Sequence, residues 1–274
     1  GGDAFRKAAR EVLGLTFVPV AFEEMASAYQ KADRDAAKAV ADHWIGAAEQ
    51  VVEPARDEIE KSGAVYVAMK KLMTKYGASG ISINCLGGFY GGHMQAYPCL
   101  GFSQLNNDGL VGGCEADQMS ALTMATIGAL VGRPGFISDP VIDTSKSQII
   151  YAHCVAMTKP FGPNGVSNPY RIRTHSEDRK GASMQSLLPA GYMTTTLEIN
   201  PVTRQVICHQ AKTAGNNLSD MACRTKLEAV VKGDIEKLTE RWRMGWHRVT
   251  FYGDLKPHVI ELCNRLKLEF VEEA

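Results

Sequence analysis

The order of hydrophobic and polar positions predicts alternating helices and strands along the first half of the chain. Helical spacing covers residues 3–14, 22–50 and 54–77, and an apolar run typical of a strand covers residues 15–20. Gly14 and Gly77 follow the last apolar positions of their helical patterns, where glycine favours the end of a helix. We therefore expect the chain to begin with long helices and an early strand.

Shorter elements continue this alternation up to about residue 140. The expected elements are a strand at 79–84, a helix at 98–107, a strand at 110–113, a helix at 116–131 and a strand at 135–138. Such alternation is typical of a parallel sheet covered by helices on both faces. The fold class expected for residues 1–140 is therefore α/β, with a Rossmann-like parallel-sheet domain.

Beyond residue 140 the pattern changes to strands joined by turn signals. The strand-like stretches cover residues 147–154, 169–174, 191–199, 204–212 and 222–231, with a helix at 234–242 and a helix-strand pair at 255–272. Polar and apolar positions alternate over residues 194–199, as in a strand with one wet face. Residues 141–274 are therefore predicted to form a mostly antiparallel β-barrel domain.

Composition and charge narrow the class of protein. The 274 residues are 45% hydrophobic and 22% charged with a formal net charge of +0, which is typical of a globular protein and gives no sign of a nucleic-acid or membrane partner. No apolar run approaches the roughly 18 residues of a membrane-spanning helix, and no secretory leader opens the chain. The 7 cysteines include no CxxC pair, so we expect reduced thiols in a cytoplasmic protein.

Candidate chemistry lies at the ends of apolar runs. Glu115 and Asp139 each follow a predicted strand, where ligands bind in open α/β sheets, and Asp117 is a weaker candidate nearby. His153 and His247 lie in distant strand-like runs. Each residue also has a structural interpretation. Glu115 could be a carboxylate in the first turn of a helix, and Asp139 could be a turn residue before Pro140. Each histidine could be a hydrogen-bonded residue of the core. Together they predict an oxygen-rich site that suits Mn²⁺ or Mg²⁺ better than Zn²⁺.

Several segments around these residues resemble the L-fucose and L-arabinose isomerases. They are PCLGFSQLNNDGLVGGCEADQMSALT, GRPGFISDP, IIYAHC and GWHRVTFYGDL, which begin at residues 98, 132, 149 and 245. The resemblance implies the middle and C-terminal domains of that family and a homo-oligomer. The family's N-terminal domain, which helps to close the pocket, has no counterpart, so we expect either a truncated chain or a domain of a longer one.

The resemblance also implies residue roles and a reaction. Glu115, Asp139 and His247 would bind Mn²⁺, and His153 matches a further histidine of the arabinose isomerases. The reaction would be the interconversion of an aldose and a ketose through an ene-diolate, with a free sugar such as L-fucose or D-arabinose as the substrate. Glu115 would act as the base and Asp139 as its acid/base partner.

Three further side chains are candidates for sugar contacts. Trp246 replaces the asparagine that precedes the histidine in L-fucose isomerases, and its indole either stacks on the sugar or fills the core. Arg173 and His175 alternate with Glu177, and they either contact sugar hydroxyls or form an exposed ion pair. Two other functions remain open at this stage. One is a carbohydrate-binding relative that has lost catalysis, and the other is a metal-dependent aldolase or epimerase.

Overall fold

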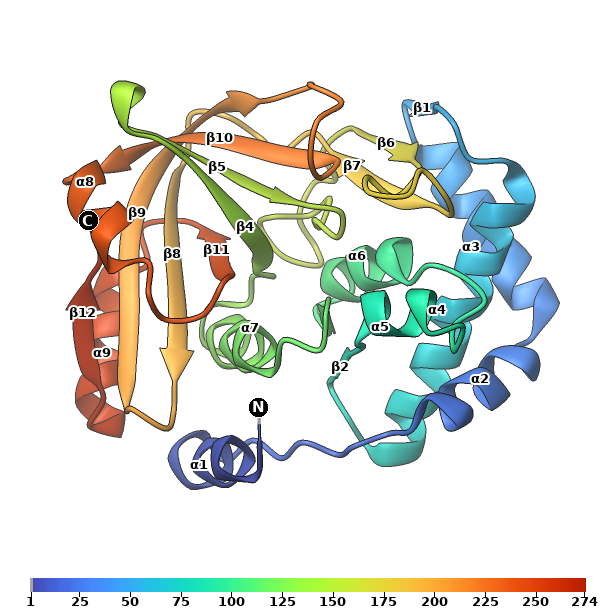
Figure 1. Cartoon of the computed structure of the whole chain (residues 1–274), viewed down its shortest axis with the longest axis horizontal. Helices are drawn as coiled ribbons and strands as arrows, with labels where there is room; N and C mark the ends of the chain where they lie inside the picture. Colours follow the sequence, from blue (N-terminus) through green and yellow to red (C-terminus); the bar gives the residue numbers. More distant parts are fainter. Residues whose placement is uncertain (1) are drawn as a thin grey trace.

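Helices form one side of the molecule, and their ends follow the capping residues (Figure 1). The computed structural model describes residues 2–274. Its first helices are α1 (Asp3–Leu13), α2 (Phe22–Gln30), α3 (Arg34–Ala47) and α4 (Arg56–Tyr76). Gly14 and Gly77 end α1 and α4 in the left-handed conformation, as expected from the sequence.

Two predictions for this region are wrong. The single helix expected over 22–50 is divided, because the Asp33 side chain accepts hydrogen bonds from the backbone N–H groups of Asp35 and Ala36 and so starts α3. The strand expected over 15–20 is an irregular segment that connects α1 to α2 (Figure 1). Pro19 cannot donate to a strand ladder, and the neighbouring valines are largely exposed to solvent.

Helix α4 lies at the centre of the helical side. Its small residues face α3, and a Cβ at Gly63 would come within 2.4 Å of the Ala37 carbonyl oxygen. This close approach lets α3 and α4 pack backbone to backbone. Buried methionines and leucines of α4, including Met69 and Leu72, then join the largest hydrophobic core.

Two small sheets stand in place of the predicted Rossmann-like parallel sheet, and one of them takes two strands from residues 170–186, a region that the sequence placed in the barrel. The strands are β1 (Gln50–Val51), β2 (Gly80–Ser82), β3 (Val111–Gly113), β6 (Tyr170–Arg173) and β7 (Ser183–Ser186). Strand β1 pairs in parallel with β6, and β2 pairs in parallel with β3. The helices between them are α5 (Cys85–Tyr90), α6 (Cys99–Asn107) and α7 (Gln118–Val131). The strands are too short to form the extended α/β sheet that their alternation with helices suggested.

The other side of the molecule is an antiparallel barrel, as predicted. Its strands are β4 (Phe136–Asp143), β5 (Gln148–His153), β8 (Met193–Asn200), β9 (Gln205–Asn216), β10 (Thr225–Lys232) and β11 (Arg248–Tyr252). Within residues 2–274 they pair in the order β10–β5–β4–β11–β8–β9, and β9 pairs with β10 to close the ring. A short 3₁₀ helix η1 (Thr144–Lys146) lies between β4 and β5, and helices α8 (Ile235–Arg241) and α9 (Lys256–Leu266) and strand β12 (Glu269–Glu272) complete the chain.

Strand β4 belongs to the barrel and not to a parallel sheet. It pairs antiparallel with β5 on one side and with β11 on the other. The boundary that the sequence suggested at residue 140 therefore lies inside a barrel strand. Strand β4 is the next element after α7, so Asp139 lies on the barrel strand that follows directly from the helical side.

The alternation over residues 194–199 does not produce a wet face. All six residues are buried, because their two faces pack inside the barrel and against helices. Thr196, for example, shares a hydrogen bond with Thr250 of the neighbouring strand β11 and donates to the Tyr151 hydroxyl of β5 inside the barrel. Within residues 2–274, no helix combines the length and the apolar character needed to cross a membrane.

Candidate metal centre

Parallel pairing of β2 with β3 brings two chain segments to one edge. Ser82 pairs with Gly113, so the residues that follow each strand lie next to each other. Cys85 and Cys114 meet there, with their sulfur atoms 3.2 Å apart. Gly112 allows β3 to approach α6, because a Cβ at that position would come within 2.6 Å of the Phe102 backbone. The edge therefore directs residues 114–117 toward the barrel.

Glu115 lies in a strained turn after β3. Glu115 and Ala116 are consecutive non-glycine residues with positive φ values of 60° and 52°. A left-handed conformation costs roughly 1–2 kcal/mol for such a residue. The Ala116 N–H donates to the Ile83 carbonyl at 2.8 Å, which holds the turn in place. Strain of this kind clusters at functional sites, and here it directs the Glu115 carboxylate to the site.

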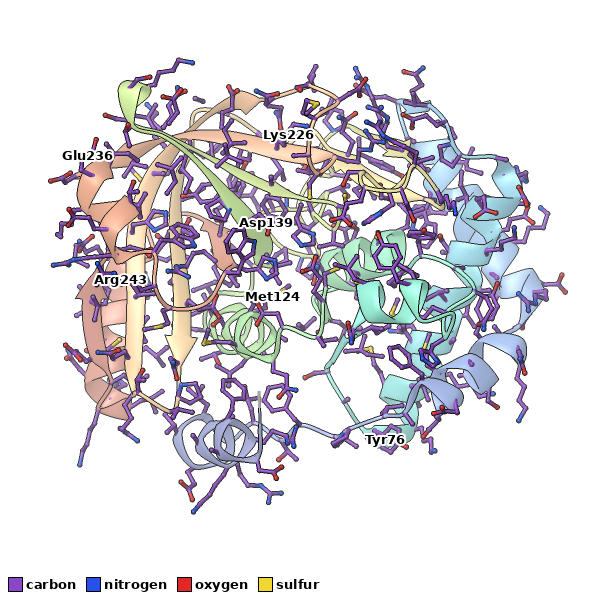
Figure 2. The ribbon with its side chains drawn as sticks, in the orientation of Figure 1. Tyr76, Met124, Asp139, Lys226, Glu236 and Arg243 are labelled. Atoms are coloured by element: carbon purple, nitrogen blue, oxygen red, sulfur yellow. The ribbon has the colours of Figure 1, made fainter. Side chains whose placement is uncertain are left out.

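Four residues predicted from the sequence meet beside this turn. The Glu115 carboxylate oxygens lie 3.6 Å from His153 Nε2 and 3.7 Å from His247 Nε2. Asp139 Oδ1 lies 3.3 Å from His247 Nε2, and one ligand atom each of Asp139, His153 and His247 falls within 4.8 Å of the others. Asp139 lies on β4 near the middle of the molecule, where the barrel faces the helices (Figure 2). The structure therefore unites side chains that are far apart in the sequence.

The donor set contains more nitrogen than the sequence suggested. It consists of two carboxylates, from Glu115 and Asp139, and two imidazoles, from His153 and His247. Carboxylates suit hard cations and imidazole suits transition metals, so the mixed set is a candidate site for a divalent cation. The Nε2 atoms of both histidines are buried, and among residues 2–274 they have no hydrogen-bond partner. Buried polar atoms without partners fit a site that binds a cation or a polar ligand.

Hydrogen bonds prepare His247 as a metal ligand. Its Nδ1–H donates to Asp117 Oδ2 at 2.9 Å, so in the neutral ring the lone pair is on Nε2, which faces Asp139 and Glu115. Asp117 is fixed in turn because its Oδ1 accepts the N–H groups of Met119 and Ser120 at the start of α7. A carboxylate that holds the distal nitrogen of a histidine is a common partner of metal ligands.

His153 is arranged in the opposite way. The backbone N–H of Cys154 donates to His153 Nδ1 at 3.0 Å, so the lone pair is on Nδ1 and the neutral ring carries its proton on Nε2. That Nε2–H points toward the Glu115 carboxylate. In this arrangement His153 presents an N–H to the site, and the ring must move its proton from Nε2 to Nδ1 before Nε2 can bind a cation.

The charges of the site stabilise one another. Nearby His153 lowers the pKa of Glu115, so this carboxylate stays ionised. Burial raises the pKa of Asp139, but the adjacent His247 outweighs burial and the net pKa is lowered. Burial also disfavours the charged form of His247, yet Asp117 and Asp139 raise its pKa to about 10. Without a cation, a protonated imidazole therefore supplies the positive charge between the carboxylates.

A cavity of about 170 Å³ opens beside these residues. Trp246 lines it and is 69% exposed, so it does not fill the core; its Nε1–H donates to Asp139. His175 also lines the cavity, with Nδ1 3.3 Å from Asp178 Oδ1. Arg173 does not share this face, because it pairs with Glu53 and Asp220. Of the three candidates for sugar contacts, Trp246 and His175 border the cavity and Arg173 supports the surrounding loops.

Some features of the site were not evident from the sequence. Asp117 was only a weaker candidate, although it follows Glu115 by two residues and lies at the start of a helix. The segment 87–93 resembles a glycine-rich loop, but residues 85–90 form α5, which contributes Leu86 and Phe89 to the cavity. Several cysteines of the hydrophobic core also line the same cavity. The spacing of the cysteines along the sequence did not predict this, because they come together only when β2, β3 and β5 assemble.

We expect Asp117→Asn to lower the affinity for Mn²⁺ by about 10–100-fold, as is common for a carboxylate that orients a metal-binding histidine. Asparagine still caps α7, so the change removes the charged acceptor of His247 without removing the helix start. Electron paramagnetic resonance of free Mn²⁺ during a titration measures the affinity. Asp33→Asn is the matched control, because Asp33 caps α3 in the same way. An unchanged affinity in Asp117→Asn would exclude the orienting role.

Comparisons with known proteins point to sugar isomerases. The chain is 25% identical over 254 residues to the sulfoquinovose isomerases of Priestia aryabhattai and Priestia megaterium, and the match covers 88% of this chain and 55% of each relative. It is 24% identical over 236 residues to the sulfoquinovose isomerase of a Clostridium species, covering 81% of this chain and 51% of that protein. No family model matches the chain.

The chain thus spans about half the length of the curated relatives it matches. The expected resemblance is confirmed at the level of sugar isomerases, whereas the comparisons do not single out the L-fucose isomerases. Over most of its length, the chain is a distant homologue of sulfoquinovose isomerases.

Proposed function

We propose that this chain carries the metal-binding part of a Mn²⁺-dependent ketol isomerase that acts on a free aldose. The observation that carries the proposal is the convergence of Glu115, Asp139 and His247 around buried, unpartnered imidazole nitrogens beside a cavity. The distant homology to sugar isomerases supports the same reaction class. The chain spans about half the length of those relatives.

The residues divide into ligands and groups that move protons. Asp139 and His247 hold the cation, with one Glu115 oxygen completing the set, and Asp117 fixes the His247 ring. A divalent cation, when bound, supplies positive charge that polarises the sugar carbonyl and favours the ene-diolate. As a ligand, His247 would use Nε2, which is the nitrogen left without a proton when Nδ1–H donates to Asp117.

Proton transfer falls to the side chains that face the cavity. Glu115 removes the proton from one sugar carbon and returns it to the next, since its lowered pKa keeps it ionised. Asp139 serves as its acid/base partner across the sugar. The His153 Nε2–H donates a hydrogen bond to a sugar oxygen, as its ring orientation favours. The exposed Trp246 indole offers an apolar face to the sugar ring.

The lining of the cavity favours an uncharged sugar. Among residues 2–274 its side chains include the carboxylates Glu115, Asp139 and Glu177, and no lysine or arginine. An anionic group on the substrate would meet these carboxylates at short range. An aldose such as L-fucose or D-arabinose avoids that repulsion, so we propose this class of substrate.

Binding of Mn²⁺ is expected to release protons. His247, with a pKa raised to about 10, is protonated at neutral pH and must become neutral to bind a cation. The apparent affinity should therefore rise about tenfold per pH unit as the pH increases toward that pKa. Titration calorimetry in buffers with different ionisation enthalpies measures the released protons. In His247→Gln this contribution should disappear, and an unchanged release would assign the proton to another group.

The decisive experiment follows the reaction in D₂O by nuclear magnetic resonance. The reduced protein is dialysed against a chelator, returned to Mn²⁺ and incubated with pentoses, hexoses and sulfoquinovose. The proposal expects deuterium exchange at C1 or C2 and a ketose product only when Mn²⁺ is present. Cleavage products would indicate an aldolase, and an epimeric aldose would indicate an epimerase. Sugar binding without exchange would indicate a relative that has lost catalysis.

A further inference from the structure

Several cysteine side chains line the cavity, and the proposed mechanism does not use them. Five cysteines line it, namely Cys85, Cys99, Cys114, Cys154 and Cys223. Cys85 and Cys99 begin α5 and α6, Cys114 and Cys154 directly follow β3 and β5, and Cys223 lies just before β10. All except Cys223 also belong to the largest hydrophobic core, so these thiols border both the core and the space that an ion could enter.

One thiol pair has the geometry of a cation site. The sulfur atoms of Cys85 and Cys114 are 3.2 Å apart. In a tetrahedral site with metal–sulfur bonds of about 2.3 Å, two sulfur atoms are roughly 3.8 Å apart, so a small outward movement suffices. Cys114, Glu115 and His153 also each offer a ligand atom within 4.8 Å of the other two. Cys85 is not part of that group of three, but it places a second sulfur atom beside Cys114 at the cavity wall.

We propose that Cys114 and Glu115, joined by the neighbouring Cys85 after a small movement of its side chain, form a second cation site, which takes a thiophilic divalent ion such as Zn²⁺ or Cd²⁺. The ion binds the two thiolates and one carboxylate oxygen, and the two S–H protons leave to solvent. Soft sulfur ligands select such ions over Mn²⁺ and Mg²⁺. The fourth position faces the cavity and the buried, unpartnered His153 Nε2.

The two sites exclude each other because they share Glu115. Its carboxylate lies against His153 and His247 on one side, and its backbone directly follows Cys114 on the other. A cation bound to the thiols draws this carboxylate away from His247. Thiophilic ions therefore displace the cation of the isomerase site, and they inhibit without binding Asp139.

The other thiols of the cavity are a weaker alternative. Cys154 Sγ lies 3.6 Å from Ser176 Oγ, and Cys223 Sγ lies 3.9 Å from Asp139 Oδ2. Within residues 2–274, neither cysteine belongs to a group of three ligand atoms at metal-binding separation. The experiment must nevertheless separate this pair from Cys85 and Cys114.

The test uses Cd²⁺ alone on the full chain, reduced and freed of metal. We expect one equivalent of Cd²⁺ to produce the ultraviolet charge-transfer band of cadmium thiolates. The ¹¹³Cd chemical shift of the wild-type complex should indicate two sulfur ligands, which tests the site even where a variant fails to fold. Absence of the band, or a shift without sulfur ligands, overturns the proposal.

Variants locate the ion. Cys114→Ser should weaken Cd²⁺ binding by at least about 100-fold and Cys85→Ser should remove about half of the band, since each thiolate contributes. Cys263→Ser, in α9 and outside the cavity lining, is the matched control and should bind as wild type. A band that survives Cys114→Ser but is lost in Cys154→Ser would place the ion on the other thiols and contradict the proposal.

The Cd²⁺ measurement does not depend on the proposed isomerase function. Asp139→Asn should keep the cadmium band while it weakens Mn²⁺ binding, because Asp139 belongs only to the first site. Cd²⁺ should also displace Mn²⁺ from the wild type in a 1:1 ratio. Loss of the band in Asp139→Asn would show that there is one site and overturn the proposal, whereas failure of isomerisation alone would concern only the proposed function.

Discussion

We expect Glu115→Gln to lower turnover of the aldose by about 10²–10⁴-fold at saturating Mn²⁺, the range typical of a positioned general base. Glutamine has the same shape and keeps the turn after β3, but it cannot accept the carbon-bound proton. The carboxylate borders the cavity and is kept ionised by His153, so its charge is available for the reaction.

The experiment compares initial rates of ketose formation with Mn²⁺ far above its dissociation constant, because Glu115 also contributes to the metal site. Thermal unfolding of the variant confirms that the fold survives. Glu261→Gln, an exposed change on α9, is the matched control. Turnover at the wild-type rate in Glu115→Gln would show that another group removes the proton.

We expect His247→Ala to lower the affinity for Mn²⁺ by more than about 100-fold, since loss of a direct ligand exceeds the loss of an orienting partner. The same change at His153 should have a smaller effect on affinity and a larger effect on turnover, because His153 presents an N–H to the site. The contrast between these two variants tests the assignment of the ring nitrogens.

Mn²⁺ titrations followed by electron paramagnetic resonance give both affinities, and the ketose assay gives both rates. His258→Ala is the control, because His258 is an exposed residue of α9. Removing His247 also leaves Asp117 and Asp139 without their shared partner, so circular dichroism must confirm a folded variant. Equal losses of Mn²⁺ affinity in the two variants would show that His153 binds the metal as directly as His247 does.

Local patterns predicted most individual elements correctly. Glycine at 14 and 77 ended helices, β5 and β8–β10 formed part of the antiparallel barrel, and helices near 98–107 and 116–131 are present. The failures have a common cause. The apolar run 15–20, the long helix over 22–50 and the parallel sheet each depended on partners or caps that local spacing does not reveal.

The sequence by itself determined which residues are candidates for the metal centre, because carboxylates and histidines at the ends of apolar runs are recognisable from local pattern and from resemblance. Only the tertiary structure decided how they meet: β4 runs in the barrel and not in a parallel sheet, and it brings Asp139 to His247, while the turn after β3 directs Glu115 between two imidazoles. It also decided the proton positions, since the tautomers of His153 and His247 follow from hydrogen bonds to Cys154 and Asp117. These contacts join residues far apart in the chain, so they depend on packing that spacing along the sequence does not encode.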